Sequence, residues 1–264
     1  MWANWGRTSG WKTRASEGAP TGDNAGMPFE IRNPSNFRDL AAHVPQAYAL
    51  KRHRLFRSDH LGALNEQDAR QIRDLGIRRV LDFRGMGERA SAACVVPDVT
   101  VHSLSIEPTI VQKLSDLLAA GTELSEGDVV ALMQDTYRGF VRGNTHRFAE
   151  FFAHLLESDE PTVFHCTAGK DRTGFAAALV LHALEVPEDV VMFDYLHTND
   201  RLRPPVPGAL PPQVARVLYR VQPEFLQAAL EAVRQDYGDI ETYLREGLQL
   251  GPAERGRLRE LYRD

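Results

Sequence analysis

The apolar positions of this chain recur with two different periods, and the period changes along the sequence. Short apolar runs between glycine, proline and charged residues predict strands, whereas apolar residues at every third or fourth position predict helices. The predicted strands lie at Arg54–Phe56, Arg78–Arg84, Val99–Leu104 and Pro161–His165. The predicted helices lie at Asn65–Leu75, Ser125–Val141, Thr145–Glu157, Phe175–Leu184, Glu188–Thr198, Pro223–Tyr237, Ile240–Glu246 and Pro252–Tyr262. This order predicts an α/β fold with a central, mostly parallel sheet flanked by helices.

The ends of this pattern suggest the domain organisation. Residues 1–26 hold all three tryptophans among small and polar residues and show no apolar period, so we expect a disordered extension. An aromatic arm that docks on a partner is the alternative interpretation. Residues 27–264 are expected to form a single domain. The helices within 109–141 and 203–221 are expected to form a lid over the functional site.

Composition and charge limit the classes of partner. The 264 residues are enough to bury a core without disulfides or metal. The net charge of -5 gives no general attraction to nucleic acid, so an anion site must be a local concentration of positive charge. No apolar run is long enough to span a membrane, and no apolar stretch follows the early charges as it would in a Sec signal peptide.

The cysteine content points to a reducing compartment. The two cysteines, Cys94 and Cys166, make neither a disulfide framework nor a zinc cluster. A free thiol survives in the cytoplasm, which is therefore the expected location, while export by a route other than Sec stays open. A protective disulfide between the two cysteines under oxidation is a hypothesis whose geometry the sequence does not supply.

The segment with candidate chemistry is the loop His165-Cys166-Thr167-Ala168-Gly169-Lys170-Asp171-Arg172-Thr173-Gly174. It lies between a predicted strand and the apolar helix at Phe175–Leu184. A strand–loop–helix unit directs backbone N–H groups and the helix dipole toward one point, where a dianion such as phosphate binds. Thr167, Ala168 and Gly169 are small enough for the backbone to curl around that anion.

Two residues at the ends of this loop suggest the reaction. Cys166 opens the loop and Arg172 closes it, with five residues between them. The planar arginine fork suits two phosphate oxygens, and the same positive field stabilises a thiolate nucleophile, so neither metal nor cofactor is needed. We interpret the chain as a cysteine-dependent phosphatase with Cys166 as nucleophile and Arg172 as phosphate clamp. Thr173 is predicted to hydrogen-bond the sulfur and help it leave, and His165 to orient the loop from beneath.

The loop matches the H-C-x5-R-[ST] pattern of the protein tyrosine phosphatases. The string Cys-Thr-Ala-Gly-Lys-Asp-Arg-Thr-Gly resembles the bacterial branch of that family, which includes dual-specificity and phosphoinositide phosphatases. Other blocks that resemble it are Asn36–Leu40, Leu55–Ser58, Leu81–Arg84, Asp194–Leu196 with Asn199–Asp200, and Tyr237 through Tyr243–Arg245. The resemblance covers most of residues 28–262. It implies the tyrosine phosphatase fold, a phosphocysteine intermediate and release of inorganic phosphate.

The donor of the proton for the leaving oxygen is open at this stage. No tryptophan follows Trp11, so the Trp-Pro-Asp string that supplies the acid in many tyrosine phosphatases is missing. The resembled branch uses an Asp within the loop, which implies Asp171 as general acid. Glu107 is the alternative, because relatives place an acidic residue near the site after the strand at Val99–Leu104.

Lys170 bears on the class of substrate. In the resembled branch, Gly-Lys at this point accompanies activity on phosphoinositides as well as on phosphotyrosine. One more cation favours substrates with several phosphates, so phosphorylated proteins and phosphoinositides are both expected substrates. Alternatively, Lys170 faces solvent and pairs with an acidic neighbour. The run Lys51–Arg54 is a candidate for a basic rim around the same pocket.

Three functional hypotheses remain. Besides the active phosphatase, they are a non-catalytic module that binds phosphorylated partners and another thiol enzyme, such as an arsenate reductase. Cys166, Arg172 and Thr173 together argue against the non-catalytic module, and a reductase would have to use Cys94 as its resolving thiol. Other polar residues are assigned to a framework around the sheet ends and not to the reaction; they are Arg38, Asp39, Asp82, Arg84 and Glu88.

Overall fold

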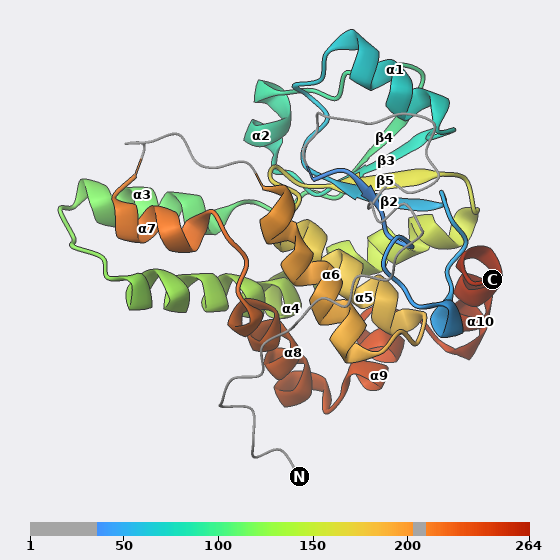
Figure 1. The fold of residues 1–264 in the computed structure, drawn as a ribbon. Helices are drawn as coiled ribbons and strands as arrows, with labels where there is room; N and C mark the ends of the chain where they lie inside the picture. The colour runs from blue at the N-terminus through green and yellow to red at the C-terminus, as the bar shows by residue number, and fades with distance from the viewer. Residues whose placement is uncertain (1–35, 203–209) are drawn as a thin grey trace, which may run out of the picture.

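The computed structural model describes residues 36–202 and 210–264, so the expected extension at 1–26 lies outside the described residues (Figure 1). Its sheet contains β1 Arg38–Asp39, β2 Leu55–Ser58, β3 Arg79–Asp82, β4 Thr100–Ser103 and β5 Thr162–His165. The strand order is β1-β2-β5-β3-β4. β1 is antiparallel to β2, and the other neighbours are parallel. The predicted α/β class with a mostly parallel sheet is therefore confirmed.

Ten α-helices connect and follow the described strands. They are α1 Glu66–Asp74, α2 Met86–Ser91, α3 Thr109–Ala119, α4 Glu126–Glu157, α5 Asp171–Ala183, α6 Glu188–Arg201, α7 Pro212–Leu218, α8 Pro223–Tyr237, α9 Ile240–Thr242 and α10 Pro252–Tyr262. A short 3-10 turn at Gln46–Tyr48 and a π turn at Tyr243–Gly247 complete the order.

The prediction of two helices between residues 125 and 157 is wrong, because α4 continues through the whole segment. The polar residues at its middle bond backward along the helix and do not end it. Asn144 donates its side-chain amide to the carbonyl of Gly139 at 3.0 Å, and the hydroxyl of Thr145 donates to the carbonyl of Val141. The buried side of the helix also runs on unbroken, from Phe140 to Phe148.

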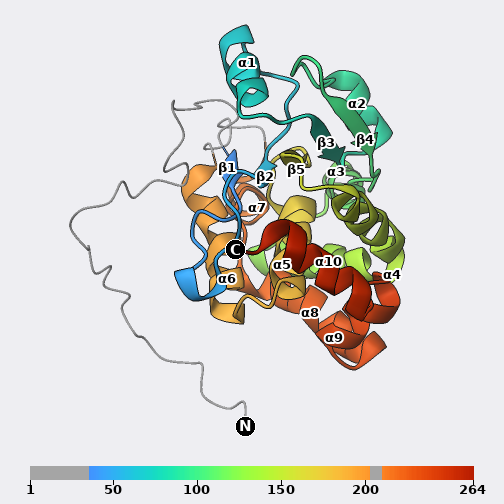
Figure 2. The same ribbon diagram turned by 90° about the vertical axis from the view of Figure 1, so that its right-hand side faces the viewer.

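The sheet separates two hydrophobic clusters of unequal size. Figures 1 and 2 show α1 and α2 on one side and the larger helical layer of α4, α5, α6, α8 and α10 on the other. Alternation along β2 sends Leu55 into the larger cluster and Phe56 into the smaller one. α5 lies at the centre of the larger layer and is buried on every side, as its apolar sequence predicts.

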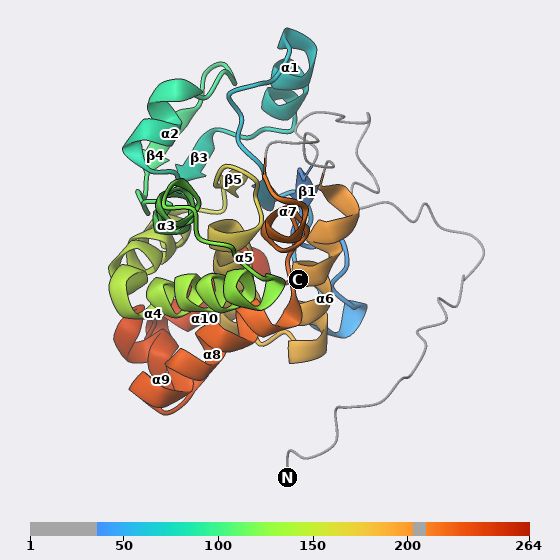
Figure 3. The ribbon, with the colours of Figure 1, turned by 90° about the vertical axis from the view of Figure 1, so that its left-hand side faces the viewer.

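The loop between β5 and α5 lies at the edge where the parallel strands end. α3 and α7 both pack against α4 on the side of the molecule to which β3 and β4 lead. Figure 3, which looks from that side, shows them on either side of the segment that joins β5 to α5. A lid role for these helices stays a prediction, since part of the proposed segment lies outside the described residues. In the described part of the chain, no helix is both long and apolar enough to span a bilayer.

Candidate active site

The loop that contains Cys166 begins where the central strand β5 ends. β5 lies between β2 and β3, so their carboxyl ends surround the loop. α5 begins at Asp171, four residues before the predicted start at Phe175. An acidic residue in the first turn is favoured by the helix dipole, which explains the early start. Asp171 and Arg172 are therefore held by the helix and not by a loose loop.

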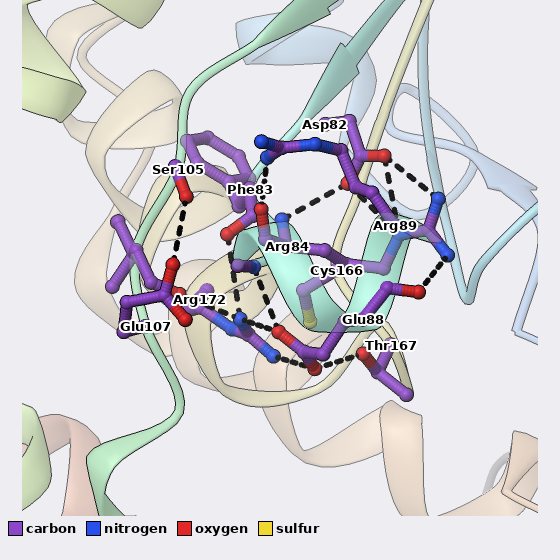
Figure 4. A network of polar contacts seen from close by, with 12 residues as sticks. Asp82, Phe83, Arg84, Glu88, Arg89, Ser105, Glu107, Cys166, Thr167 and Arg172 are labelled. Atoms are coloured by element: carbon purple, nitrogen blue, oxygen red, sulfur yellow. Dashed lines mark hydrogen bonds and ion pairs between the residues drawn. The ribbon is translucent and has the colours of Figure 1, made fainter. Parts of the chain in front are cut away.

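The sulfur of Cys166 lies at the bottom of the loop. The residue is 2% exposed, and Figure 4 shows its sulfur on the side where Glu88, Thr167 and Arg172 meet. Burial alone would lower the pKa of Arg172, but its bonds to Glu88 and the charges of Cys166 and Asp171 raise that pKa above its usual value. The guanidinium thus stays charged beside the thiol, as a stabilised thiolate requires.

Glu88 holds the far edge of the Arg172 guanidinium. Nη1 of Arg172 lies 2.7 Å from Oε2 of Glu88, and Nη2 lies 2.9 Å from Oε1. Nη1 also donates to the carbonyls of Ile106 at 2.8 Å and Phe83 at 3.3 Å. Glu88 uses one N–H of Nη2, so the N–H of Nε and the second N–H of Nη2, which form the other edge of the guanidinium, have no assigned partner among the described residues. Because that edge contains two N–H groups in a fork, it can bind two phosphate oxygens.

Further bonds fix Glu88 itself. Thr167 donates its hydroxyl to the Glu88 carboxylate, and the backbone N–H of Gly85 donates to it at 2.8 Å (Figure 4). Burial raises the pKa of Glu88, but the pair with Arg172 outweighs burial and lowers the pKa to about 2. The sequence places Glu88 in a framework around the sheet ends and therefore does not predict its contact with Arg172. A local signal exists, since Glu88 is the third residue of α2 and its carboxylate accepts the backbone N–H of Gly85 at the N-cap, which is half of a capping box.

Polar groups from neighbouring segments tie the loop carbonyls outward. The side-chain amide of Asn36 donates to the carbonyls of Ala168 at 3.1 Å and Gly169 at 2.9 Å. The backbone N–H of His60 donates to the carbonyl of Thr167 at 3.0 Å. Carbonyls held outward turn the following N–H groups toward the inside of the loop. Such carbonyls fit the nest of amides that the sequence predicts for an anion, which stays a prediction.

Gly169 is required where the loop passes β2. Its φ is +66°, and a Cβ on this residue would lie 2.3 Å from the carbonyl oxygen of Ser58. Only glycine avoids both the backbone strain and the clash. The small-residue prediction for this stretch therefore has a specific structural reason at this position.

Two buried arginines support the loop from below. Nη1 of Arg57 lies 2.5 Å from Oδ2 of Asp194, and Nε of Arg38 lies 3.2 Å from Oδ1. Arg57 also donates to the carbonyl of Gly169 at 3.0 Å. Burial raises the pKa of Asp194, but the two arginines lower it overall, so the carboxylate stays ionised. The three sequence blocks that contain these residues thus meet beneath the phosphate loop.

His165 and Thr173 differ in how far they match the sequence-based prediction. Nδ1 of His165 donates to the carbonyl of Cys166 at 3.0 Å, which fits a role in orienting the loop. Burial lowers the pKa of His165 to about 4, so the ring is neutral near pH 7. The Thr173 hydroxyl is buried and makes no hydrogen bond within the described part of the chain, to the sulfur or otherwise. Its part in releasing the sulfur stays a prediction.

The two candidate acids occupy different places. Asp171 is the first residue of α5, and its Oδ1 accepts a bond from the hydroxyl of Tyr137 at 3.0 Å. Glu107 is exposed and accepts bonds from the backbone N–H of Met86 at 3.1 Å and from the Ser105 hydroxyl at 3.3 Å. Glu107 therefore braces the turn before α2, next to the residue that positions Arg172 (Figure 4).

The positions of Lys170 and of the basic run Lys51–Arg54 differ from those expected from the sequence. Lys170 is 6% exposed and not solvent-facing, and its Nζ lies 2.6 Å from Oδ2 of Asp171. The basic rim at Lys51–Arg54 is wrong, because this run precedes β2 and lies at the opposite end of the parallel strands. Its side chains also have other contacts: Lys51 with a backbone carbonyl near the C-terminus, Arg52 with Asp39 and Arg54 with Asp159.

Comparison with known proteins agrees with this geometry. The profile of the tyrosine phosphatase family matches residues 29–264. The chain belongs to the tyrosine phosphatase family. It is 30% identical over 258 residues to the triple specificity protein phosphatase PtpB of Mycobacterium tuberculosis, covering 82% of this chain and 92% of that protein. It is 26% identical over 237 residues to a tyrosine-protein phosphatase of Nostoc commune, covering 80% of this chain and 76% of that protein.

A solved structure was also matched. The crystal structure of TpbA from P. aeruginosa shares 18% identity with this phosphatase, with a TM-score of 0.35. The match covers 63% of this chain and 81% of that chain. The family profile and the relatives make this chain a cysteine-dependent phosphatase, so the enzyme class predicted from its sequence is confirmed.

Proposed function

We propose that this phosphatase hydrolyses phosphotyrosine in proteins, and the phosphate esters of phosphoserine, phosphothreonine and phosphoinositides, through a phosphocysteine on Cys166. The observation that supports it most is the Arg172 guanidinium, whose far edge is held by Glu88 and whose Nε and Nη2 edge remains for phosphate. The buried sulfur lies at the bottom of the same loop. This arrangement suits a tetrahedral dianion that enters with one oxygen pointing outward.

The proposed reaction has two steps. In the first, the Cys166 thiolate attacks phosphorus, the bond to the ester oxygen breaks, and Asp171 gives its proton to that oxygen. In the second, Asp171 takes a proton from water, the water oxygen attacks phosphorus, and the thiolate leaves with inorganic phosphate as product. Arg172 and the loop amides stabilise the charge on the equatorial oxygens in both steps.

An assay on aryl phosphates of different leaving groups tests these roles. Cys166→Ser is expected to abolish turnover of all of them. Asp171→Asn is expected to slow poor leaving groups far more than good ones, because only a poor leaving group needs the proton. Glu107→Gln is the matched control and should slow both classes little. The reverse result, with leaving-group dependence at Glu107, would assign the acid to that residue.

The lipid part of the proposal depends on Lys170. The support for it is the position of a lysine within the phosphate loop and a 30% identical relative that is named as a triple specificity phosphatase. A phosphotyrosyl peptide and a soluble inositol phosphate head group should both be turned over, and Cys166→Ser should lose both. Absence of head-group turnover, with normal peptide turnover, would remove the lipid substrate and leave the rest intact.

We further propose that the enzyme works as one domain over residues 27–264 in the cytoplasm, on phosphorylated proteins and without a nucleic-acid partner. Both cysteines are free thiols in the structure, which suits a reducing compartment. Fractionation of cells that express the tagged full-length chain tests the location. Recovery of the protein outside the cells without lysis would contradict it.

A further inference from the structure

Two buried tyrosines from different helices form a chain of hydroxyls that ends on Asp171. The hydroxyl of Tyr137, on α4, lies 3.0 Å from Oδ1 of Asp171. The hydroxyl of Tyr195, on α6, lies 2.7 Å from that of Tyr137. Both tyrosines are almost fully buried. Three helices of the larger layer thus converge on one carboxylate of the phosphate loop.

The protons that each group carries determine which hydroxyl donates and which accepts in this chain. Oδ1 of Asp171 bears no proton when the carboxyl group is ionised or when its proton is on Oδ2, so the single proton of Tyr137 is donated to Asp171. The hydroxyl of Tyr195 must then donate to the oxygen of Tyr137. Burial raises the pKa of both tyrosines well above its usual value, so both hydroxyls keep their protons at neutral pH. The pair is therefore a fixed donor and not a base.

Packing prevents these hydroxyls from turning away. The Tyr137 ring contacts the rings of Phe140 and Phe225, with centroids 5.0 Å and 5.8 Å away. The Tyr195 ring lies against Gly174, where an added Cβ would be 3.0 Å from the ring. A glycine immediately after the phosphate loop therefore makes room for Tyr195. The cost of leaving a buried hydroxyl unpaired also favours the observed chain.

The two oxygens of Asp171 are consequently different. Oδ1 accepts from Tyr137 and also from Nζ of Lys170 at 2.7 Å, whereas Oδ2 accepts from Lys170 at 2.6 Å. We propose that Tyr137, supported by Tyr195, is a positioning residue that fixes Oδ1, so that Oδ2 carries the proton given to the leaving oxygen. The proposal rests on the proposed role of Asp171 as general acid.

The groups around Asp171 show which contacts fix its carboxyl group. The groups that face Asp171 are Lys170 and Arg172 from its own loop and helix, Tyr137 from α4 and Tyr195 from α6. Among the side chains that the structure describes, Lys170 and Tyr137 are the ones that bond the Asp171 carboxyl group directly. Removing the Tyr137 hydroxyl takes one of the two donors from Oδ1, so the direction of Oδ2 is less well fixed.

The variant Tyr137→Phe tests the proposal. With a poor leaving group, kcat should fall about tenfold, the effect of losing one hydrogen bond to a charged group, while KM changes little. With a good leaving group, kcat should fall less than about twofold, because little proton transfer is needed. Tyr195→Phe should give a smaller change in the same direction.

Tyr243→Phe is the matched control. Tyr243 is also buried, and its hydroxyl lies 3.0 Å from that of Thr145 on the same helix α4, with no contact to the loop. Its removal should leave both the leaving-group dependence and KM unchanged. Thermal unfolding of each variant shows whether a loss of activity comes from a loss of folded protein. An identical kinetic change in Tyr243→Phe would overturn the proposal.

A double variant separates this proposal from the proposed function. In the background of Asp171→Asn, adding Tyr137→Phe should cause no further selective loss on poor leaving groups. Further selective loss there, or equal loss on good and poor leaving groups in Tyr137→Phe alone, would refute a role through Asp171. If Asp171→Asn itself shows no leaving-group dependence, the general-acid assignment fails, and the positioning role falls with it.

Discussion

Replacing Glu88 with glutamine removes one charge and leaves the shape of the side chain almost unchanged. In the native protein the carboxylate binds both terminal nitrogens of Arg172 at 2.7 Å and 2.9 Å. The Glu88 side chain is 20% exposed, so water screens this pair only in part. An amide offers one acceptor and turns its NH2 toward the guanidinium, so Arg172 should lose its fixed direction. The expected result is a fall in kcat/KM of about 10- to 100-fold, from the loss of one or two charged hydrogen bonds.

The same change should alter the dependence of stability on pH. The pKa of Glu88 falls from 4.5 to about 2 on folding, a difference worth about 3 kcal/mol of unfolding free energy as an upper value. Because the folded-state pKa is the lower one, this stabilisation is complete above pH 4.5 and is lost as the pH falls toward 2. Wild type and Glu88→Gln should differ by up to about 3 kcal/mol at pH 7 and by about half of that difference at pH 3.

Urea unfolding across this pH range and steady-state kinetics with an aryl phosphate measure the two effects. Glu107→Gln is the control, since Glu107 lies beside the same turn but is exposed and does not touch Arg172. It should change kcat/KM and stability little. Activity of Glu88→Gln within twofold of wild type, or a stability difference that does not depend on pH, would refute the role given to the Glu88–Arg172 pair.

Three other changes test the support of the loop. Gly169→Ala should destabilise the protein by about 1–3 kcal/mol in thermal unfolding and abolish activity, because Gly169 has a positive φ and lies close to the β2 backbone. Gly143→Ala is the control; Gly143 has open space around it on α4, so this change should stabilise the protein slightly. Burial lowers the pKa of His165 from 6.5 to about 4, so stability should decline as the pH falls from 6.5 toward 4, and His165→Asn should lack that decline in unfolding titrations. Asp194→Asn should cost about 3–5 kcal/mol in urea unfolding, because two buried arginines lose their shared anion; a cost below 1 kcal/mol would contradict this.

The chemistry of the loop was predictable because it is local in sequence. The strand, the curled small residues, Cys166 and Arg172 follow one another, and their spacing alone places a thiol opposite a guanidinium. The start of α5 was harder, since Asp171, Arg172 and Thr173 are polar and the apolar pattern begins only at Phe175. The continuity of α4 is not predicted for a similar reason. Polar residues that hydrogen-bond back along a helix are of the same types as the residues that end a helix.

Contacts between distant segments could not be predicted from periodicity. Glu88 meets Arg172 across 84 residues, and Tyr137 meets Asp171 across 34. The sheet topology brings the ends of β3 and β5 together and so determines the first contact, and the packing of α4 against α5 determines the second. The resemblance to the family singled out sequence blocks such as Asn36–Leu40. Only the structure shows what this block does: Asn36 hydrogen-bonds the carbonyls of the phosphate loop and holds them outward.

Rapid acid quenching during turnover of an aryl phosphate, followed by mass mapping of peptides, tests the central claim most directly. The account predicts one phosphoryl group on the peptide that contains Cys166, formed as fast as the leaving group is released and absent in Cys166→Ser. A phosphoryl group on another residue, or full turnover by Cys166→Ser, would contradict it.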